Sequence, residues 1–303
     1  MKNLILSILF LQFSLISFSQ DATKEIFERA VKFKKEGKYK EALVEYDKVL
    51  LIKPEFVNAL INRANVKSLL KDNEGAIVDL NAAEKIDPSE PEVYYNRGNT
   101  EHDLKLYKEA IVDYDKAISL SSHEDYYLGR ANSKKAIGLY EDAITDYSKA
   151  ISINSKFADA FYNRANAKQK INDFAGAIED YNKAIEIDPN KIESYMNRGN
   201  AKIRLQKFQE AIMDFDTYIK MNPNNYLAYS NRGIANGGLK NTKDAINDYT
   251  KAIEMNPNSA DSYFGRAGIK HSTGDKDGEC ADLKKAADLG YERAKNIYDK
   301  NCK

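Results

Sequence analysis

Residues 158–191 have the sequence ADAFYNRANAKQKINDFAGAIEDYNKAIEIDPNK, and variants of this stretch fill most of the chain. A large side chain follows its Ala177 by four residues, and a small residue, Ala165, precedes it by twelve. The same pattern recurs at intervals of 34, 34, 33, 34, 34 and 34 residues, at Ala42, Ala76, Ala110, Ala143, Ala177, Ala211 and Ala245. A period kept over seven copies indicates a repeat architecture rather than two or three independent domains.

Each repeat is predicted to form two helices. In residues 177–187, apolar residues such as Ala177, Tyr181 and Ala184 are three or four positions apart, which places them on one helical face. Five repeats close with a proline, for example Pro189, which cannot donate a backbone hydrogen bond and therefore ends the second helix. Because a single helix pair cannot bury its apolar face, neighbouring pairs must stack.

The repeat resembles the tetratricopeptide repeat, which has the same period, a small residue in the first helix, Ala and an aromatic residue in the second, and a closing proline. The resemblance implies an all-α solenoid, a right-handed superhelix of helix pairs with a concave groove lined by the first helix of each pair. The solenoid is expected at residues 20–289, with repeats near 23–56, 57–90, 91–123, 124–157, 158–191, 192–225, 226–259 and 260–289. The eighth repeat departs from the pattern because Glu279 stands in place of the alanine.

The composition argues against nucleic acid as a partner. The chain has 46 Lys plus Arg and 46 Asp plus Glu, so it lacks the cationic excess on which phosphate binding depends. Its 43% of apolar residues excludes a disordered chain, and two cysteines among 303 residues exclude a disulfide-rich small scaffold.

The N-terminus has the pattern of a secretory signal peptide. Lys2 precedes an apolar run at residues 4–18, and the small residues Ser17 and Ser19 flank Phe18. We therefore predict a signal peptide at residues 1–19, cleaved after Ser19, and an exported protein, periplasmic or secreted. A run of 15 residues is short for a membrane span of about 20, and an uncleaved anchor is the alternative. The mature chain has no second apolar run long enough to cross a membrane.

Every repeat has an arginine in its first helix and an acid 16 residues later in its second. A constant offset of this kind predicts an ion pair between antiparallel helices, with a structural role. The seven pairs after the first repeat are Arg63–Asp79, Arg97–Asp113, Arg130–Asp146, Arg164–Asp180, Arg198–Asp214, Arg232–Asp248 and Arg266–Asp282. The first repeat has Arg29 and Glu45.

Asparagine recurs in the middle of the predicted first helices, although it is a mediocre helix former. One set of asparagines directly precedes the arginines, and a second set follows three residues later on the same helical face. We call these residues the amide row: Asn62, Asn65, Asn96, Asn99, Asn132, Asn163, Asn166, Asn197, Asn200 and Asn231. With Tyr95, Tyr162 and Met196 beside it, the row is predicted to line the groove and to bind the backbone of an extended peptide of any sequence.

The amide row has a second interpretation, in which the side chains bond to the neighbouring repeat and serve packing alone, as is frequent in the family. Family members that bind acidic C-terminal peptides of chaperones place Lys and Arg one turn from the groove Asn. The corresponding positions here hold Asn58, Glu92, Asp125, Asp159, Glu193 and Asp261. The sequence therefore disfavours a receptor for chaperone tails and favours a basic or neutral partner.

The chain closes with a further helix at residues 290–303, which is expected to follow Gly290 and to cap the exposed end of the solenoid. Folding it antiparallel to the preceding helix brings Cys280 close to Cys302, so we expect a disulfide in an exported protein. Two free thiols are the alternative. A metal site is not expected, because no His lies near the cysteines in the repeat register.

No catalytic constellation is present in the sequence. His102, His123 and His271 fall in different repeats, and no P-loop, HExxH motif, dinucleotide-binding glycine motif or nucleophile elbow occurs. The sequence thus predicts neither an enzyme nor a cofactor nor a small-molecule substrate. It predicts a scaffold that binds a peptide or protein segment in its groove. The alternative is a structural or self-associating envelope component that uses its convex face or its ends, with the amides serving packing only.

Overall fold

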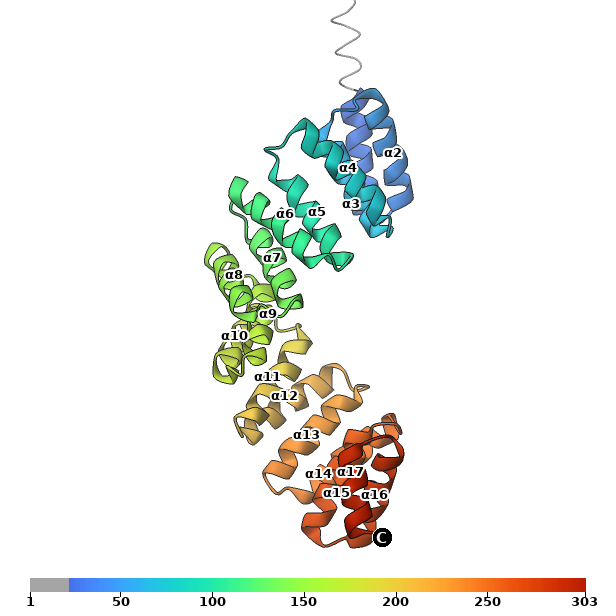
Figure 1. The fold of residues 1–303 in the computed structure, drawn as a ribbon, viewed down its shortest axis with the longest axis vertical. Helices are drawn as coiled ribbons and strands as arrows, with labels where there is room; N and C mark the ends of the chain where they lie inside the picture. Colours follow the sequence, from blue (N-terminus) through green and yellow to red (C-terminus); the bar gives the residue numbers. More distant parts are fainter. Residues whose placement is uncertain (1–21) are drawn as a thin grey trace, which may run out of the picture. The chain divides into compact units, whose positions relative to one another are not determined.

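The computed structural model describes residues 22–303, and the predicted signal peptide at residues 1–19 lies outside them. Within the described residues the chain consists of helices and short turns, with no strand (Figure 1). It forms two compact units that divide between Ile153 and Asn154. This division is next to Ser155, which occupies the position where five other repeats have a proline.

The first unit contains four helix pairs, beginning with a helical segment at residues 22–35. The helices that follow it are α2 (Tyr39–Ile52), α3 (Val57–Leu69), α4 (Asn73–Ile86), α5 (Pro91–Asp103), α6 (Tyr107–Leu120), α7 (Glu124–Ala136) and α8 (Tyr140–Ile153). The helices of the second unit are α9 (Ala158–Lys170), α10 (Phe174–Ile187), α11 (Ile192–Arg204), α12 (Phe208–Met221), α13 (Tyr226–Gly238), α14 (Thr242–Met255), α15 (Ala260–Thr273), α16 (Lys276–Asp288) and α17 (Glu292–Asn301).

Within each unit the pairs stack as the repeat pattern predicts. The two helices of a pair contact each other, and each second helix contacts the first helix of the next pair, as α4 contacts α5 and α10 contacts α11. First helices also touch along the stack, as α3 touches α5 and α11 touches α13. The all-α solenoid architecture is confirmed in both units.

The repeated small and large residues form the core. The large residue of each second helix is at most 4% exposed in Tyr46, Leu80, Tyr114, Tyr147, Tyr181, Phe215 and Tyr249. The first helix approaches this side chain closely: a Cβ on Gly199 would lie 2.8 Å from the Phe215 ring. A small residue at this position is therefore a requirement of the packing.

The turn inside each pair contains one residue in the left-handed region, where L side chains are strained. Gly37, Gly138 and Gly274 supply it in three repeats, with φ between 72° and 84°. The other repeats tolerate a side chain there, at Lys71, Lys105, Asn172, Gln206 and Lys240. The second helices end two residues before the closing proline where one is present. Since α6 and α8 end in the same register without a proline, proline reinforces this boundary and is not its only cause.

All eight predicted ion pairs are formed. Arg198, for example, donates from Nη2 to Oδ1 of Asp214 at 2.5 Å and from Nε to Oδ2 at 3.0 Å, and the Asp214 side chain is only 4% exposed. The sequence analysis missed a third member: a lysine four residues after the arginine, such as Lys202, whose Nζ lies 2.9 Å from Asp214 Oδ2. The same lysine position is filled in four other repeats, by Lys67, Lys134, Lys168 and Lys270.

The C-terminal helix α17 packs on α16, and Cys280 and Cys302 form the expected disulfide, with their Cα atoms 5.6 Å apart. The irregular Glu279 is buried, with its side chain 5% exposed, and it is held by Lys276 at 3.3 Å and His271 at 3.1 Å. The Lys276 ammonium and the His271 imidazole thus give the buried acid two polar partners where the other repeats have alanine.

Replacing Arg198 with Met should lower the free energy of unfolding by about 3 kcal/mol, because Asp214 then keeps only one of its two cations in a buried position. Urea unfolding measures this change. Lys183→Met is the matched control, since the exposed Lys183–Glu186 pair contributes at most about 0.5 kcal/mol. Equal effects of the two substitutions would contradict the assignment.

Cys302→Ser should destabilise the second unit by about 3 kcal/mol, because the disulfide closes a loop with a sequence separation of 22. Thermal unfolding of this variant, compared with wild type with and without reductant, tests the prediction. The reduced wild type should match the variant, and a wild type insensitive to reductant would contradict it.

Candidate functional site

The amide row lies on the first helices and lines one hollow in each unit. The first-unit hollow has a volume of about 370 Å³ and includes Asn65, Asn96 and Asn99 in its lining. The second-unit hollow has a volume of about 430 Å³, and its lining includes Asn166, Asn197, Asn200 and Asn231. Both volumes are in the range of ligand sites in proteins. Asn62, Asn132 and Asn163 line neither of these two hollows.

The second set of asparagines takes part in packing as well. Tyr181 Oη donates to Asn166 Oδ1 at 2.5 Å, and Tyr114 and Tyr147 donate in the same way to Asn99 and Asn132. Each tyrosine is the buried residue of the second helix, fifteen positions after its asparagine. This hydrogen bond was not predicted, although the constant offset of fifteen residues is visible in the sequence. This bond joins the two helices of one repeat, so the oxygens of these three amides take part in packing in a way that differs from the predicted bond to a neighbouring repeat.

The amide is left free of this bond where the second helix lacks a tyrosine. Leu80 follows Asn65 by fifteen residues, and the side chain of Asn65 makes no hydrogen bond within residues 22–303. Phe215 follows Asn200, whose Oδ1 instead accepts from Asn231 Nδ2 of the next repeat at 2.9 Å. Without a tyrosine, the oxygen of Asn65 is thus left without a partner in residues 22–303, whereas that of Asn200 is used by the next repeat.

The first set of asparagines makes two kinds of hydrogen bond. Asn62, Asn96 and Asn163 donate to the backbone oxygens of Asn58, Glu92 and Asp159, four residues earlier in their own helices. Asn197 and Asn231 instead donate across to the preceding repeat. Asn197 Nδ2 lies 3.0 Å from Asn166 Oδ1 and 3.2 Å from Tyr162 Oη.

The three apolar or aromatic residues predicted beside the row are half-buried and also contact neighbouring repeats. Tyr95 packs on Tyr126, with ring centroids 4.9 Å apart. Tyr162 Oη accepts from Asn197 Nδ2 of the next repeat at 3.2 Å, and Met196 Sδ is 3.7 Å from Asn231 Nδ2. Lys191 of the same repeat lies 5.0 Å from the Tyr162 ring.

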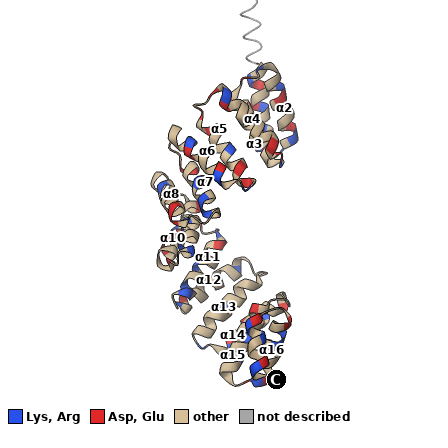
Figure 2. Ribbon diagram, viewed as in Figure 1, with Lys and Arg blue, Asp and Glu red and all other residues tan. Residues whose placement is uncertain are grey.

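The charge of the hollows differs from the sequence-based expectation. Lys170 and Arg204 are the charged residues in the lining of the second-unit hollow, and the first-unit hollow has Lys34, Lys71 and Asp103. The acids that suggested a basic partner lie in the first turn of the first helices, whereas these cations lie at or near the other end of the helices. Figure 2 shows charges of both signs interspersed along the helices, with α13 almost uncharged. The positive lining removes the argument for a basic partner.

One repeat breaks the ion-pair pattern with a carboxylate. Glu101 stands where five repeats have the lysine, next to Asp113 and its partner Arg97, and Glu101 Oε2 is buried with no hydrogen-bond partner in the described chain. Burial raises the pKa of Glu101 to about 7, and the charge of Asp113 raises it too, whereas Arg97 lowers it. The third repeat therefore has a carboxyl group that changes its charge near neutral pH.

Residues 22–303 contain neither a candidate metal site nor a candidate membrane span. There is no cluster of three or more His, Cys, Asp or Glu side chains that could hold a metal ion. Among the same residues, no helix combines the length and the apolar character needed to span a membrane.

The chain belongs to the tetratricopeptide repeat family. Tetratricopeptide repeat models match residues 91–123, 158–191, 192–225 and 226–259, and a further TPR repeat model matches residues 69–105 and 131–172. Repeats of this family typically mediate protein–protein interaction, and the family consists in general of non-enzymatic scaffolds. No curated protein sequence matches the chain.

Solved structures with the same fold come from several tetratricopeptide proteins. The C-terminal part of a TPR repeat-containing protein from Cytophaga hutchinsonii is 20% identical, with a TM-score of 0.65 over 78% of this chain and 98% of that one. A tetratricopeptide repeat protein from Parabacteroides merdae is 21% identical, with a TM-score of 0.57 over 82% and 99%. YrrB, described as a TPR protein with an unusual peptide-binding site, is 22% identical, with a TM-score of 0.56 over 60% and 95%. At these identities the likeness shows the fold alone.

Glu101 predicts a pH dependence of stability. Its folded-state pKa of about 7 lies above the ordinary 4.5, so the folded chain binds this proton more tightly than the unfolded chain. The contribution of this proton to the free energy of unfolding is complete below about pH 4.5 and is lost as the pH rises to about 7. The loss should be on the order of 2 kcal/mol, allowing for partial screening by solvent.

Thermal unfolding from pH 4.5 to 8 tests this, with the charged neighbours Asp113, Arg97 and Glu109 left intact. Glu101→Lys restores the pattern of the other repeats, so it should raise the melting temperature at pH 8 and flatten the profile. An unchanged pH profile in this variant would contradict the assignment.

Proposed function

We propose that the protein is a non-enzymatic scaffold that binds an extended peptide or protein segment along its first helices, with the second-unit hollow as the principal site. The observation that carries the proposal is that packing uses only part of the amides lining this hollow. Four amide atoms there have no hydrogen-bond partner within residues 22–303: Nδ2 of Asn166, Oδ1 of Asn197, Nδ2 of Asn200 and Oδ1 of Asn231.

These atoms offer what a peptide backbone requires. They are two donors and two acceptors, supplied in alternation by α9 and α11 and then by α11 and α13. An extended backbone likewise presents N–H and C=O groups in alternation and can bond to them irrespective of its side chains. The amides that carry these atoms are fixed by their other bonds, so little further side-chain freedom is lost on binding.

The surroundings of the amides favour a neutral or acidic segment. Lys170 and Arg204 line the same hollow, and Ile203 and Ile234 add apolar contact surface. Arg204 is oriented by the Phe174 ring, 4.8 Å away. The peptide-binding site of YrrB, a protein with the same fold, is consistent with this use of the scaffold.

We place this activity outside the cytoplasm, in the periplasm or the extracellular medium. The proposal rests on the signal-like residues 1–19 and agrees with the disulfide of Cys280 and Cys302, a bond typical of oxidising compartments.

A second candidate function, self-association through the second helices, has one observation in its favour. Val44, Val78 and Val112 occupy the same position of α2, α4 and α6 and are 53%, 65% and 66% exposed. Exposed β-branched residues repeated in register on three helices are a feature of interaction surfaces.

The test of the groove uses substitutions that keep the packing bond. Asn166→Asp together with Asn200→Asp keeps the oxygens that accept from Tyr181 and Asn231 and replaces the two free donors. Peptides selected from a random 12-residue displayed library on the wild type should bind this variant at least tenfold more weakly in fluorescence anisotropy, because a donor to each peptide carbonyl is lost.

Asn132→Asp is the matched control, since Asn132 accepts from Tyr147 in the same way but lies outside both hollows. It makes the same chemical change at one position, adding one negative charge against the two of the double variant, and should leave the affinity unchanged. A selection that yields no peptide, or equal weakening by the control, would contradict binding at the amide row.

A further inference from the structure

A different kind of pocket lies at the C-terminal end of the second unit, between α15, α16 and α17. Its volume is about 270 Å³, and Phe264, Ala267, Leu283 and Ile297 form its apolar walls. Ala267 and Leu283 belong to the buried core of this region, and Phe264 and Ile297 pack against that core. The pocket is therefore a recess in a hydrophobic cluster, in contrast to the two hollows lined by amides.

The residue at the register position of the amide row leaves space for the pocket. Gly268, which also lines the pocket, has the register position that Asn166 and Asn200 occupy in earlier repeats. A Cβ added to Gly268 would meet no atom within 4 Å, whereas one added to Gly265 would lie 2.5 Å from the Tyr249 ring. Packing thus demands glycine at 265 but not at 268, where its effect is to leave space.

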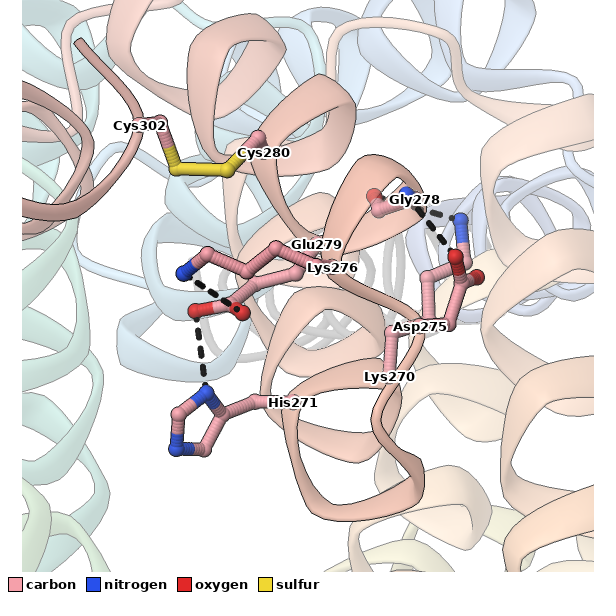
Figure 3. Close-up of a disulfide and its surroundings, with 8 residues drawn as sticks. All are labelled: Lys270, His271, Asp275, Lys276, Gly278, Glu279, Cys280 and Cys302. Carbon is pink, nitrogen blue, oxygen red and sulfur yellow. Dashed lines mark hydrogen bonds and ion pairs between the residues drawn. A yellow bond between two sulfur atoms is a disulfide. The ribbon is translucent and has the colours of Figure 1, made fainter.

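The walls of the pocket are held in place before any ligand binds. The Phe264 ring packs against the Tyr291 ring, with centroids 4.8 Å apart, and the Arg293 guanidinium lies 5.4 Å from the centre of the Phe264 ring. The disulfide fixes the end of α17, which supplies Ile297, to α16 (Figure 3). A preformed pocket binds at a lower cost in conformational entropy.

The polar groups at the pocket are already compensated. Figure 3 shows Glu279 between His271 and Lys276, at 3.1 Å and 3.3 Å. No unpaired carboxylate of the lining therefore opposes an apolar ligand. His271 is exposed and Asn301 lies at the end of α17, so polar groups are available beside the apolar walls.

The volume decides between classes of ligand. Cofactor and drug-sized sites occupy about 300–1,000 Å³, whereas an apolar cavity of about 150 Å³ already admits benzene. A pocket of about 270 Å³ suits a single large side chain. We propose that it binds one large apolar side chain, aliphatic or aromatic, of the segment held by the amide row.

This inference rests on the proposed function and on the continuity of the site. Asn166, Asn200, Ile234 and Gly268 occupy one register position on the successive first helices α9, α11, α13 and α15. The helices α11 and α13 contact each other, as do α13 and α15. A segment that follows the free amides from α9 to α13 thus reaches the pocket at the next helix.

The experiment titrates the full chain with toluene, the analogue of a Phe side chain, and follows the methyl NMR signals of Leu283 and Ile297. Saturable shifts are expected in the wild type and in Gly268→Ala, which adds only a Cβ. Gly268→Leu fills the space and should weaken toluene binding at least tenfold. The peptides selected on the wild type should lose at least tenfold in affinity for Gly268→Leu and keep their affinity for Gly268→Ala.

The absence of shifts in the wild type, or equal toluene binding by Gly268→Leu, overturns the pocket. Should Gly268→Leu fail to fold, Ile297→Asn, which makes one wall polar, decides by the same two readouts. If toluene does not bind, but the selected peptides bind and depend on Asn166 and Asn200, only the pocket is refuted. Specific toluene binding without any selected peptide refutes the amide-row function and leaves no segment to anchor, so it overturns the present inference as well.

Discussion

The buried Arg–carboxylate pair is the interaction on which the rest of the structure depends. In each repeat the arginine of the first helix is bonded to the acid of the second, which fixes how both helices are rotated about their axes. Because successive helical residues point about 100° apart, fixing Arg164 or Arg198 also fixes the asparagine before it. The amide row is thus positioned by the same contact that holds each helix pair together.

The packing of the pairs then determines which amide atoms remain available. A tyrosine in the second helix uses the oxygen of the asparagine fifteen residues earlier, and a leucine or phenylalanine does not. The converse holds at Tyr46, which follows Val31 by fifteen residues and whose buried hydroxyl has no partner in residues 22–303. Packing and recognition are therefore not exclusive roles for these side chains, since one amide has atoms enough for both.

Features with a constant offset could be predicted from the sequence. The helix pairs and the Arg–Asp bonds follow from spacing, because residues at the same offset in each repeat make the same contact. The Cys280–Cys302 disulfide follows from the antiparallel folding of the last helix after Gly290. The Asn–Tyr bond and the lysine four residues after five of the arginines also have constant offsets and could have been found in the same way. The bonds between neighbouring repeats, such as Asn231 to Asn200, depend on how successive helix pairs pack, and the pocket at Gly268 depends on the position of α17. These two features could not be predicted from the sequence, because they depend on contacts that are not made in every repeat.

The most direct test of the central claim, that spare amide atoms on the first helices bind the partner, is NMR of the side-chain amides in the presence of a selected peptide. The Nδ2 groups of Asn166 and Asn200 should shift and exchange more slowly with water, while that of Asn132 stays unchanged. Shifts confined to the methyl groups of Val44, Val78 and Val112, with the three amides unaffected, would contradict the account.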